Sequence, residues 1–229
     1  MGQAKQRAMS ETAAVNVFQG RVDLERLSTA FRKLFASAAA SPGRDCLLYA
    51  SLGQALIRKL GADARIVAGH AAWRVGPNDG DMITHASSGA GWTGFHQMGD
   101  QTMFLGHAWL EIGDRILDLT TWQLPLKAKM LDEMDGGSTQ VEWRPDFLFV
   151  EKSAVSGFAE ARQSAHSGAF YYQAIGAIRA KVLAAIEASP YDPTDLFALE
   201  QIYRNPHIQT IGPNDIESAE NEPEQPKFR

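Results

Sequence analysis

The sequence predicts an α+β protein in which helices come first, antiparallel strands follow, and helices return at the end. Apolar residues recur at helical spacing before residue 61 and after residue 157, and apolar runs bounded by turn residues lie between them. The 229 residues, 45% of them hydrophobic, suit one compact domain with appendages. We expect an N-terminal extension over 1–22, one domain over 23–211, and an acidic disordered tail over 212–229.

The first predicted helices are separated by the helix-breaking sequence Ser41-Pro42-Gly43. One extends from Asp23 to about Ala39, with apolar residues on one face and Asp23 as its cap. The other begins near Cys46 and ends at Gly61, with leucines at helical spacing. The short basic start of the chain, Gln3 to Arg7, is expected to be a frayed terminus.

Strands are predicted over residues 64–75, 103–112, 115–120 and 146–150. The segment from Gly76 to Asp100 is rich in Gly, Ser, Asn and Asp, and is expected to be a long functional or mobile loop. Gly113-Asp114 fits the two-residue turn of a hairpin. Apolar spacing then predicts a long helix over 157–188, and a short final helix over 193–203.

Charge and cysteine content exclude several classes of protein. The net charge is −5, of which −3 belongs to the acidic tail, and this argues against a protein that coats nucleic acid. No run of eighteen apolar residues exists, so no membrane span is predicted. The N-terminus lacks the apolar core of a secretory signal, so we expect a cytoplasmic protein. The single cysteine can form neither an internal disulfide nor a thiolate zinc cage.

That cysteine, Cys46, is the first candidate for chemistry. It lies in the first turn of a predicted helix, where free N–H groups and the helix dipole stabilise a thiolate. The alternative is that Cys46 is an inert, buried, small hydrophobic residue, which is common for free cysteines.

His107 and Asp118 strengthen the catalytic interpretation. Each is a polar residue in an apolar strand and so needs a partner or a task. If Gly113-Asp114 is the turn, Ile112 pairs with Arg115, and His107 and Asp118 become diagonal neighbours on one face of the hairpin. This arrangement provides a base and the group that orients it, and a thiolate at a nearby helix end would complete a triad. The alternative is a purely structural His–Asp pair.

These motifs resemble a known family. The sequences Asp45-Cys46-Leu47-Leu48, Gly106-His107-Ala108-Trp109-Leu110-Glu111 and Leu117-Asp118-Leu119-Thr120 are similar to the transglutaminase-like branch of the papain-like cysteine enzymes. The resemblance, which covers about Arg44 to Thr120, implies a helix carrying the cysteine packed on an antiparallel sheet carrying the histidine and aspartate. The branch includes peptidases, among them lasso-peptide maturation proteases, as well as deamidases and acyl transferases.

We therefore expect a papain/transglutaminase-like thiol hydrolase that cleaves an amide or peptide bond through an acyl-enzyme. Cys46 would be the nucleophile, His107 the general acid and base, and Asp118 the residue that orients the imidazole. The expected partner is a peptide or protein substrate, with no cofactor, no nucleic acid and no membrane. The oligomeric state is left open.

Other residues are assigned around this centre. Trp109 and Trp92 are predicted to contact substrate, and the insertion from Gly76 to Asp100 would form a lid or specificity element. The backbone N–H of Cys46 would supply one oxyanion donor. The second donor is unassigned, because no glutamine lies between Ser37 and Asp45 as in papain-like peptidases. The candidates for this donor are Gln19, Gln101 and Trp92.

Two rival interpretations stay open. One is a non-catalytic binding module on the same fold, with Cys46 unreactive. The other is a histidine–metal hydrolase that uses His85, His96 and His107, together with Asp81 or Asp100. It is less favoured because the tight local histidine pairs of zinc sites are absent from the sequence.

Overall fold

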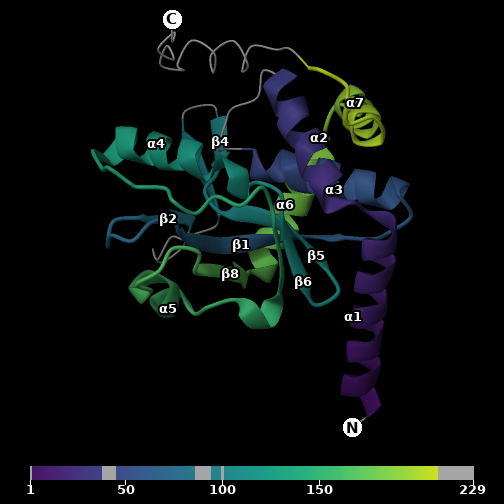
Figure 1. Ribbon diagram of the computed structural model, residues 1–229, viewed down its shortest axis with the longest axis horizontal. Coiled ribbons are helices and arrows are strands. Elements are labelled where there is room, and N and C mark those ends of the chain that lie inside the picture. Colours follow the sequence, from purple (N-terminus) through teal and green to yellow (C-terminus); the bar gives the residue numbers. More distant parts are fainter. Residues whose placement is uncertain (1, 38–44, 86–93, 99–100, 211–229) are drawn as a thin grey trace, which may run out of the picture.

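The computed structural model describes residues 2–37, 45–85, 94–98 and 101–210, without the side chains of residues 2–5, 7, 97–98 and 101–103. The acidic tail predicted over 212–229 therefore lies outside the described residues. Within them the chain is α+β, as predicted, with an antiparallel sheet and helices packed around it (Figure 1).

The α-helices in chain order are α1 Gly2–Arg21, α2 Leu24–Ser37, α3 Cys46–Lys59, α4 Leu124–Asp135, α5 Phe158–Gln163, α6 Gly176–Ala188 and α7 Pro193–Arg204. Short 3-10 turns lie at Thr121–Gln123 and Lys152–Ala154. The strands are β1 Arg65–Arg74, β2 Met82–His85, β3 Phe95–Met98, β4 Gln101–Phe104, β5 His107–Ile112, β6 Arg115–Asp118, β7 Leu148–Glu151 and β8 Phe170–Ala174.

The larger sheet has the order β2-β1-β5-β6-β7, and β8 also pairs with β1. The long strand β1 is its centre: it pairs with β5 over Arg65–Gly69, with β2 over Ala71–Arg74, and with β8 over Gly69–Trp73. All of these pairings are antiparallel. The first residue of β5, His107, is thereby placed opposite Gly69 in the middle of the sheet.

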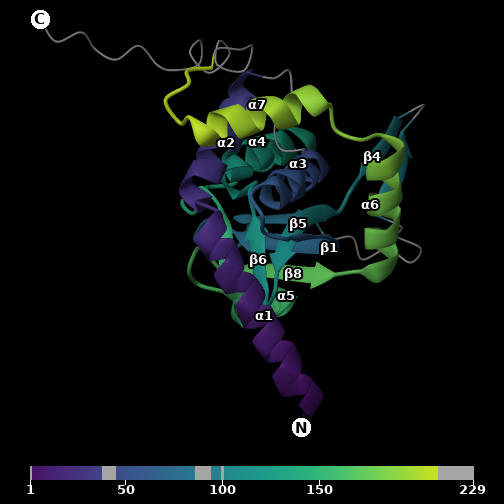
Figure 2. The ribbon, with the colours of Figure 1, turned by 90° about the vertical axis from the view of Figure 1, so that its right-hand side faces the viewer.

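Both faces of the sheet are buried. The α3 face carries Ile66, Ala68, Ala108, Leu110 and Leu117, packed with buried residues of α1, α2, α3, α6 and α7. The α4 face carries Val67, Trp73, Trp109, Ile116 and Tyr172, packed with Leu124 and Ala128 of α4. Figure 2 shows α2, α3 and α7 stacked together above the sheet. Successive side chains along β5 and β6 therefore point alternately into two different hydrophobic cores.

The helices predicted near both ends are confirmed at α2, α3 and α7. In α2 the buried residues Leu27, Phe31, Leu34 and Phe35 form one face at helical spacing. In α7 the side chain of Asp192 accepts a hydrogen bond from the Thr194 N–H, so it caps the helix in the position that the sequence pattern favours.

The frayed terminus predicted over Gln3 to Arg7 is wrong, because these residues belong to the helix α1, Gly2–Arg21. Its second half packs against the domain through the buried side chains of Val15 and Phe18, while its first turns extend away from the body (Figures 1 and 2). The backbone of Glu11 lies against Gly113 in the β5–β6 turn, so closely that a Cβ atom at residue 113 would overlap the Glu11 carbonyl oxygen. Gly113, which also has φ +56°, allows both the turn and this contact.

Two further strand predictions need correction. The single strand expected over 103–112 is broken, because β4 ends at Phe104, pairs with β3 in a separate two-stranded sheet, and leaves β5 to begin at His107. The loop expected from Gly76 to Asp100 contains β2 and β3. These strands are short and lie between turns, so their alternation is too brief to be detected in the sequence. Residues 86–93 and 99–100 lie outside the described residues.

The long helix predicted over 157–188 is also wrong. The structure divides it into α5, β8 and α6. The run Phe170-Tyr171-Tyr172 has high strand propensity, and its pairing with β1 supplies hydrogen bonds and buried contacts that outweigh the helical spacing of the apolar residues. Conversely, α4 is a helix where none is predicted.

Candidate active site

The structure brings Cys46, His107 and Asp118 together. Cys46 is the first residue of α3, and its thiol lies beside the His107 imidazole and the Ala108 backbone, while His107 Nδ1 has no hydrogen-bond partner among the described residues. On the other side of the imidazole, His107 Nε2 lies 2.7 Å from Asp118 Oδ2. Because Nε2 is bound to the carboxylate, Nδ1 is the nitrogen left for the thiol. This is the order of groups in a nucleophile–base–orienter relay.

The hairpin register accounts for the His–Asp contact. Ile112 pairs with Arg115 and Leu110 with Leu117, as the two-residue turn predicts. His107 and Asp118 therefore project on the α4 face, and the diagonal separation is bridged by their side chains. Cys46 reaches the same point from the start of α3, where the helix meets the start of β5.

Asp118 is fixed by four hydrogen bonds. Oδ2 accepts from His107 and from the Tyr172 hydroxyl, each at 2.7 Å. Oδ1 accepts from the backbone N–H and the hydroxyl of Thr120, each at 2.8 Å. The carboxylate is 1% exposed, so this set of donors supplies the solvation that water would otherwise provide.

Aromatic rings surround the imidazole on the α4 face. The Trp73 ring meets His107 edge to face at 4.9 Å between centroids, and Trp73 Nε1 donates to the Tyr172 hydroxyl at 2.8 Å. His85 stacks on His107 at 5.8 Å, and Trp109 stacks on it at 6.1 Å. These contacts hold the imidazole plane and exclude water from the relay.

The electrostatic environment favours an ionised thiol. Burial by itself would raise the pKa of Cys46, but the adjacent His107 imidazole, the charge of Lys127 and the Ala108 amide outweigh burial and lower this pKa. Burial opposes the charged form of His107 as well, yet Asp118 and the thiol raise the imidazole pKa. A lowered thiol pKa together with a raised imidazole pKa favours a thiolate–imidazolium pair.

Two other titratable groups border the relay. Burial, with smaller contributions from the charges of Lys127 and His107, lowers the pKa of His85 well below its ordinary value and keeps it neutral. Burial raises the pKa of Asp45 to about 6, and only the charge of Lys127 opposes this shift. Asp45 Oδ2 has no hydrogen-bond partner among the described residues.

The other residues predicted at the site are placed differently. Trp109 is 2% exposed and packs behind His107, and its role as a substrate contact stays a prediction. Trp92 and the side chain of Gln101 lie outside the described residues. Gln19 is an exposed residue of α1. Within the described residues, therefore, none of the three candidates for the second oxyanion donor is seen beside the triad.

Sequence reasoning missed the support of the triad by Tyr172, Trp73 and Lys127. Tyr172 lies far along the chain, within a segment predicted to be helical, and Lys127 lies in an unpredicted helix. A local signal exists only for Thr120, which follows Asp118 by two residues and forms the Asx-type turn typical of that spacing.

The structure also bears on the metal alternative. His96 is an exposed residue of β3, in the separate two-stranded sheet. Asp81 is engaged by the backbone N–H groups of Asn78 and Gln140, each at 2.8 Å. Across the described ranges, no three His, Cys, Asp or Glu side chains are grouped so that they could hold a metal ion. Asp100 lies outside these ranges.

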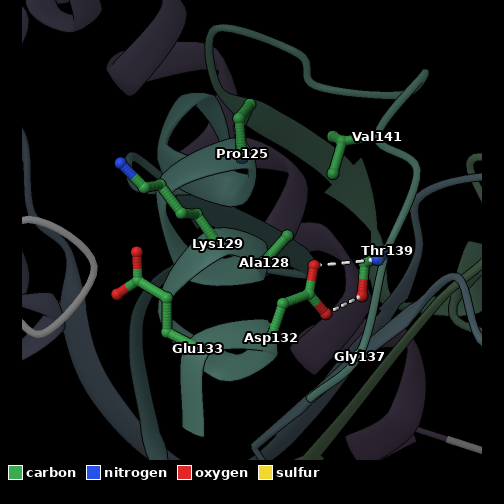
Figure 3. A pocket seen from close by; sticks show the side chains of 8 residues that line it. All are labelled: Pro125, Ala128, Lys129, Asp132, Glu133, Gly137, Thr139 and Val141. Carbon is green, nitrogen blue, oxygen red and sulfur yellow. Dashed lines mark hydrogen bonds between the residues drawn. The ribbon is translucent and has the colours of Figure 1, made fainter. Parts of the chain in front are cut away.

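A separate groove of about 460 Å³ lies along α4 and the segment that follows it (Figure 3). It is lined by Pro125, Ala128, Lys129, Asp132, Glu133, Gly137, Thr139 and Val141. Its central carboxylate, Asp132, accepts hydrogen bonds from the backbone N–H and the hydroxyl of Thr139, each at 2.8 Å. These hydrogen bonds fix the chain that follows α4 against the helix. No member of the triad lines this groove.

Comparison with known proteins supports the fold without assigning an activity. No known family and no curated protein matches the sequence. A solved crystal structure, described only as "genomics APC5867", is similar with a TM-score of 0.52 and 16% identity, covering 83% of this chain and 82% of that one. This likeness concerns the fold alone. In the part of the chain that the structure describes, no helix has both the length and the apolar character needed to cross a bilayer.

Proposed function

We propose that this protein is a thiol hydrolase of papain/transglutaminase-like architecture that acts on an amide or peptide bond. The observation that carries the proposal is the arrangement of three groups: a thiol at the first residue of a helix lies beside an imidazole, and Nε2 of that imidazole is 2.7 Å from a buried carboxylate. Three residues predicted from separate parts of the sequence meet at one point. The substrate would be a peptide or protein, and the chemistry needs no cofactor.

The reaction would proceed through a thioester. His107 takes the Cys46 proton, and the thiolate adds to the carbonyl carbon of the amide. When the tetrahedral adduct collapses, the carbon–nitrogen bond breaks, and the imidazolium gives its proton to the departing amine. Water then attacks the thioester, with His107 as the base, and releases a carboxylic acid and the free thiol. An amine in place of water would give transfer instead of hydrolysis.

Developing negative charge on the carbonyl oxygen would be stabilised at the start of α3. The N–H of Cys46, as the first residue of the helix, has no acceptor within the helix. It supplies one oxyanion donor at the positive end of the helix dipole. Asp118 keeps its charge throughout, because it orients the imidazole and stabilises the imidazolium.

Labelling of the single cysteine tests the proposal directly. Iodoacetamide, and a chloroacetamide analogue of glutamine, should alkylate Cys46 at pH 6–7 faster than a free cysteine, with the adduct located by mass spectrometry. Turnover of a peptide library is followed by new termini for cleavage and by ammonia for deamidation, and Cys46→Ala should abolish both while keeping the fold. A wild-type thiol no faster than free cysteine, or turnover retained by the alanine variant, excludes this mechanism.

The second candidate function is a non-catalytic binding module. The observation that favours it is the enclosure of the relay: Cys46 is 9% exposed and His107 is completely buried. The same labelling experiment separates the two functions. A binding module predicts an unreactive thiol, whereas the hydrolase predicts rapid alkylation at a pH where ordinary thiols are protonated.

A further inference from the structure

We infer that Lys127 is a positioning residue of the relay, a buried cation that balances the negative charges of Asp118 and the Cys46 thiolate. The inference rests on the proposed function, since it concerns how the same site is held in its reactive form. Lys127 belongs to α4, a helix that contributes no member of the triad.

The geometry holds the ammonium group against the triad. Lys127 is 2% exposed, although lysine side chains are almost never fully buried without a partner. Its Nζ lies 3.4 Å from the Thr120 hydroxyl, which in turn donates to Asp118 Oδ1 at 2.8 Å. The same Nζ sits over the Trp73 ring, 4.9 Å from its centroid. Two direct contacts therefore place the cation one hydroxyl group away from the orienting carboxylate.

The charges around Lys127 explain why a cation is needed there. The titratable groups that face it come from four elements and the residue preceding α3, and they are Asp45, Cys46, His85, His107 and Asp118. In the reactive state Asp118 and Cys46 are anions, His107 is a cation and His85 is neutral, and Asp45, whose pKa is raised to about 6, adds a further negative charge above that pH. Without Lys127 this buried cluster would carry an uncompensated negative charge, which protein interiors tolerate poorly.

The cation acts on the two reacting groups in opposite ways. It favours the thiolate of Cys46 by attraction, and it disfavours the imidazolium of His107 by repulsion. Removing the charge should therefore move thiolate formation to higher pH, and imidazolium deprotonation to higher pH as well. A loss of packing alone would lower reactivity without moving the inflections for Cys46 and His107 in the same direction. The dependence of the alkylation rate on pH therefore separates an electrostatic role of Lys127 from a packing role.

The test uses the full chain, in which Cys46 is the single thiol, so the alkylation rate measures Cys46 alone. The rate of iodoacetamide alkylation is measured from pH 4 to 10 for wild type, Lys127→Met and Lys127→Arg. In Lys127→Met both inflections of the pH–rate profile should rise by about one to three pH units, as for a unit charge about 12 to 4 Å away at an effective dielectric constant near 20. Lys127→Arg, which keeps the charge, should restore the wild-type inflections. Lys129→Met, on the exposed side of the same helix, should leave them unchanged.

A measurement on the wild-type protein covers the case in which Lys127→Met does not fold. The Cε resonance of Lys127 should show a charged ammonium at every pH where Cys46 is reactive, and an uncharged lysine in that range overturns the inference. An activated wild-type thiol with unchanged inflections in Lys127→Met also overturns it while leaving the hydrolase intact. If the wild-type thiol titrates like free cysteine, the proposed function itself fails.

Discussion

Replacing Asp118 by asparagine separates the charge of the carboxylate from its shape. Oδ1 must stay an acceptor, because the backbone N–H of Thr120 points at it from 2.8 Å and cannot reverse. The new amide NH₂ group is therefore expected at the Oδ2 position, facing His107 and Tyr172, which both donate to that oxygen in the native protein. His107 Nε2 can meet the NH₂ group only as an acceptor, which forces the imidazole proton onto Nδ1. In that tautomer the nitrogen that faces Cys46 cannot accept the thiol proton.

The expected losses follow from this exchange. The hydrogen bonds to a buried, charged acceptor are each worth about 1.5–3 kcal/mol, and the Tyr172 hydroxyl loses its acceptor. We expect Asp118→Asn to lower the free energy of unfolding by about 2 kcal/mol, or ~4–8 °C in Tm for a chain of this size. Turnover should fall by about 10⁴-fold, the scale associated with a wrong imidazole tautomer in such relays. Alkylation of Cys46 at pH 6 should slow as well.

Thermal unfolding and the pH dependence of alkylation measure these effects together. The matched control is Asp63→Asn, since Asp63 is 82% exposed in its ion pair with Arg58 and should change neither property. The hydrogen bonds and the charge of His107 overcome burial and hold the pKa of Asp118 well below its ordinary value of 3.8. Its stabilisation is therefore present above that value and lost as the pH falls toward the lowered pKa. An asparagine variant with wild-type Tm and wild-type alkylation inflections would refute the reasoning.

Three more predictions test the surroundings of the site. Tyr172→Phe removes one donor to Asp118 and should cost about 1–2 kcal/mol of stability and reduce turnover by about tenfold; equal Tm and turnover in both proteins would contradict this role. Burial raises the pKa of the half-buried Asp45 to about 6, so its ionisation opposes folding as the pH rises from 3.8 through 6. Asp45→Asn should thus stabilise the protein by about 1 kcal/mol at pH 8 and not at pH 3, and chemical denaturation at both pH values checks the sign. Gly69→Ala would place a Cβ atom on the Gln173 carbonyl oxygen, and should cost about 3 kcal/mol or more by separating β8 from β1; circular dichroism melting that matches wild type would argue against this pairing.

The sequence determines the parts of this site that depend on local rules. The two-residue turn at Gly113-Asp114 sets the pairing of β5 with β6, and this register places His107 and Asp118 on one face. The helix break before Cys46 and the leucine spacing after it place the thiol at a helix start. Each of these signals lies within about ten consecutive residues, so turn length and apolar periodicity are sufficient to read them.

Only the tertiary structure decides what surrounds the triad. β8 pairs with β1 about 100 residues earlier in the chain, and this long-range contact overrides the helical spacing of its segment and brings Tyr172 to Asp118. Likewise, no local pattern in the sequence marks Lys127 as buried, and it becomes a buried cation because α4 packs across the face that carries the relay. The energy of such contacts arises from pairing and burial between distant segments, which no local pattern records.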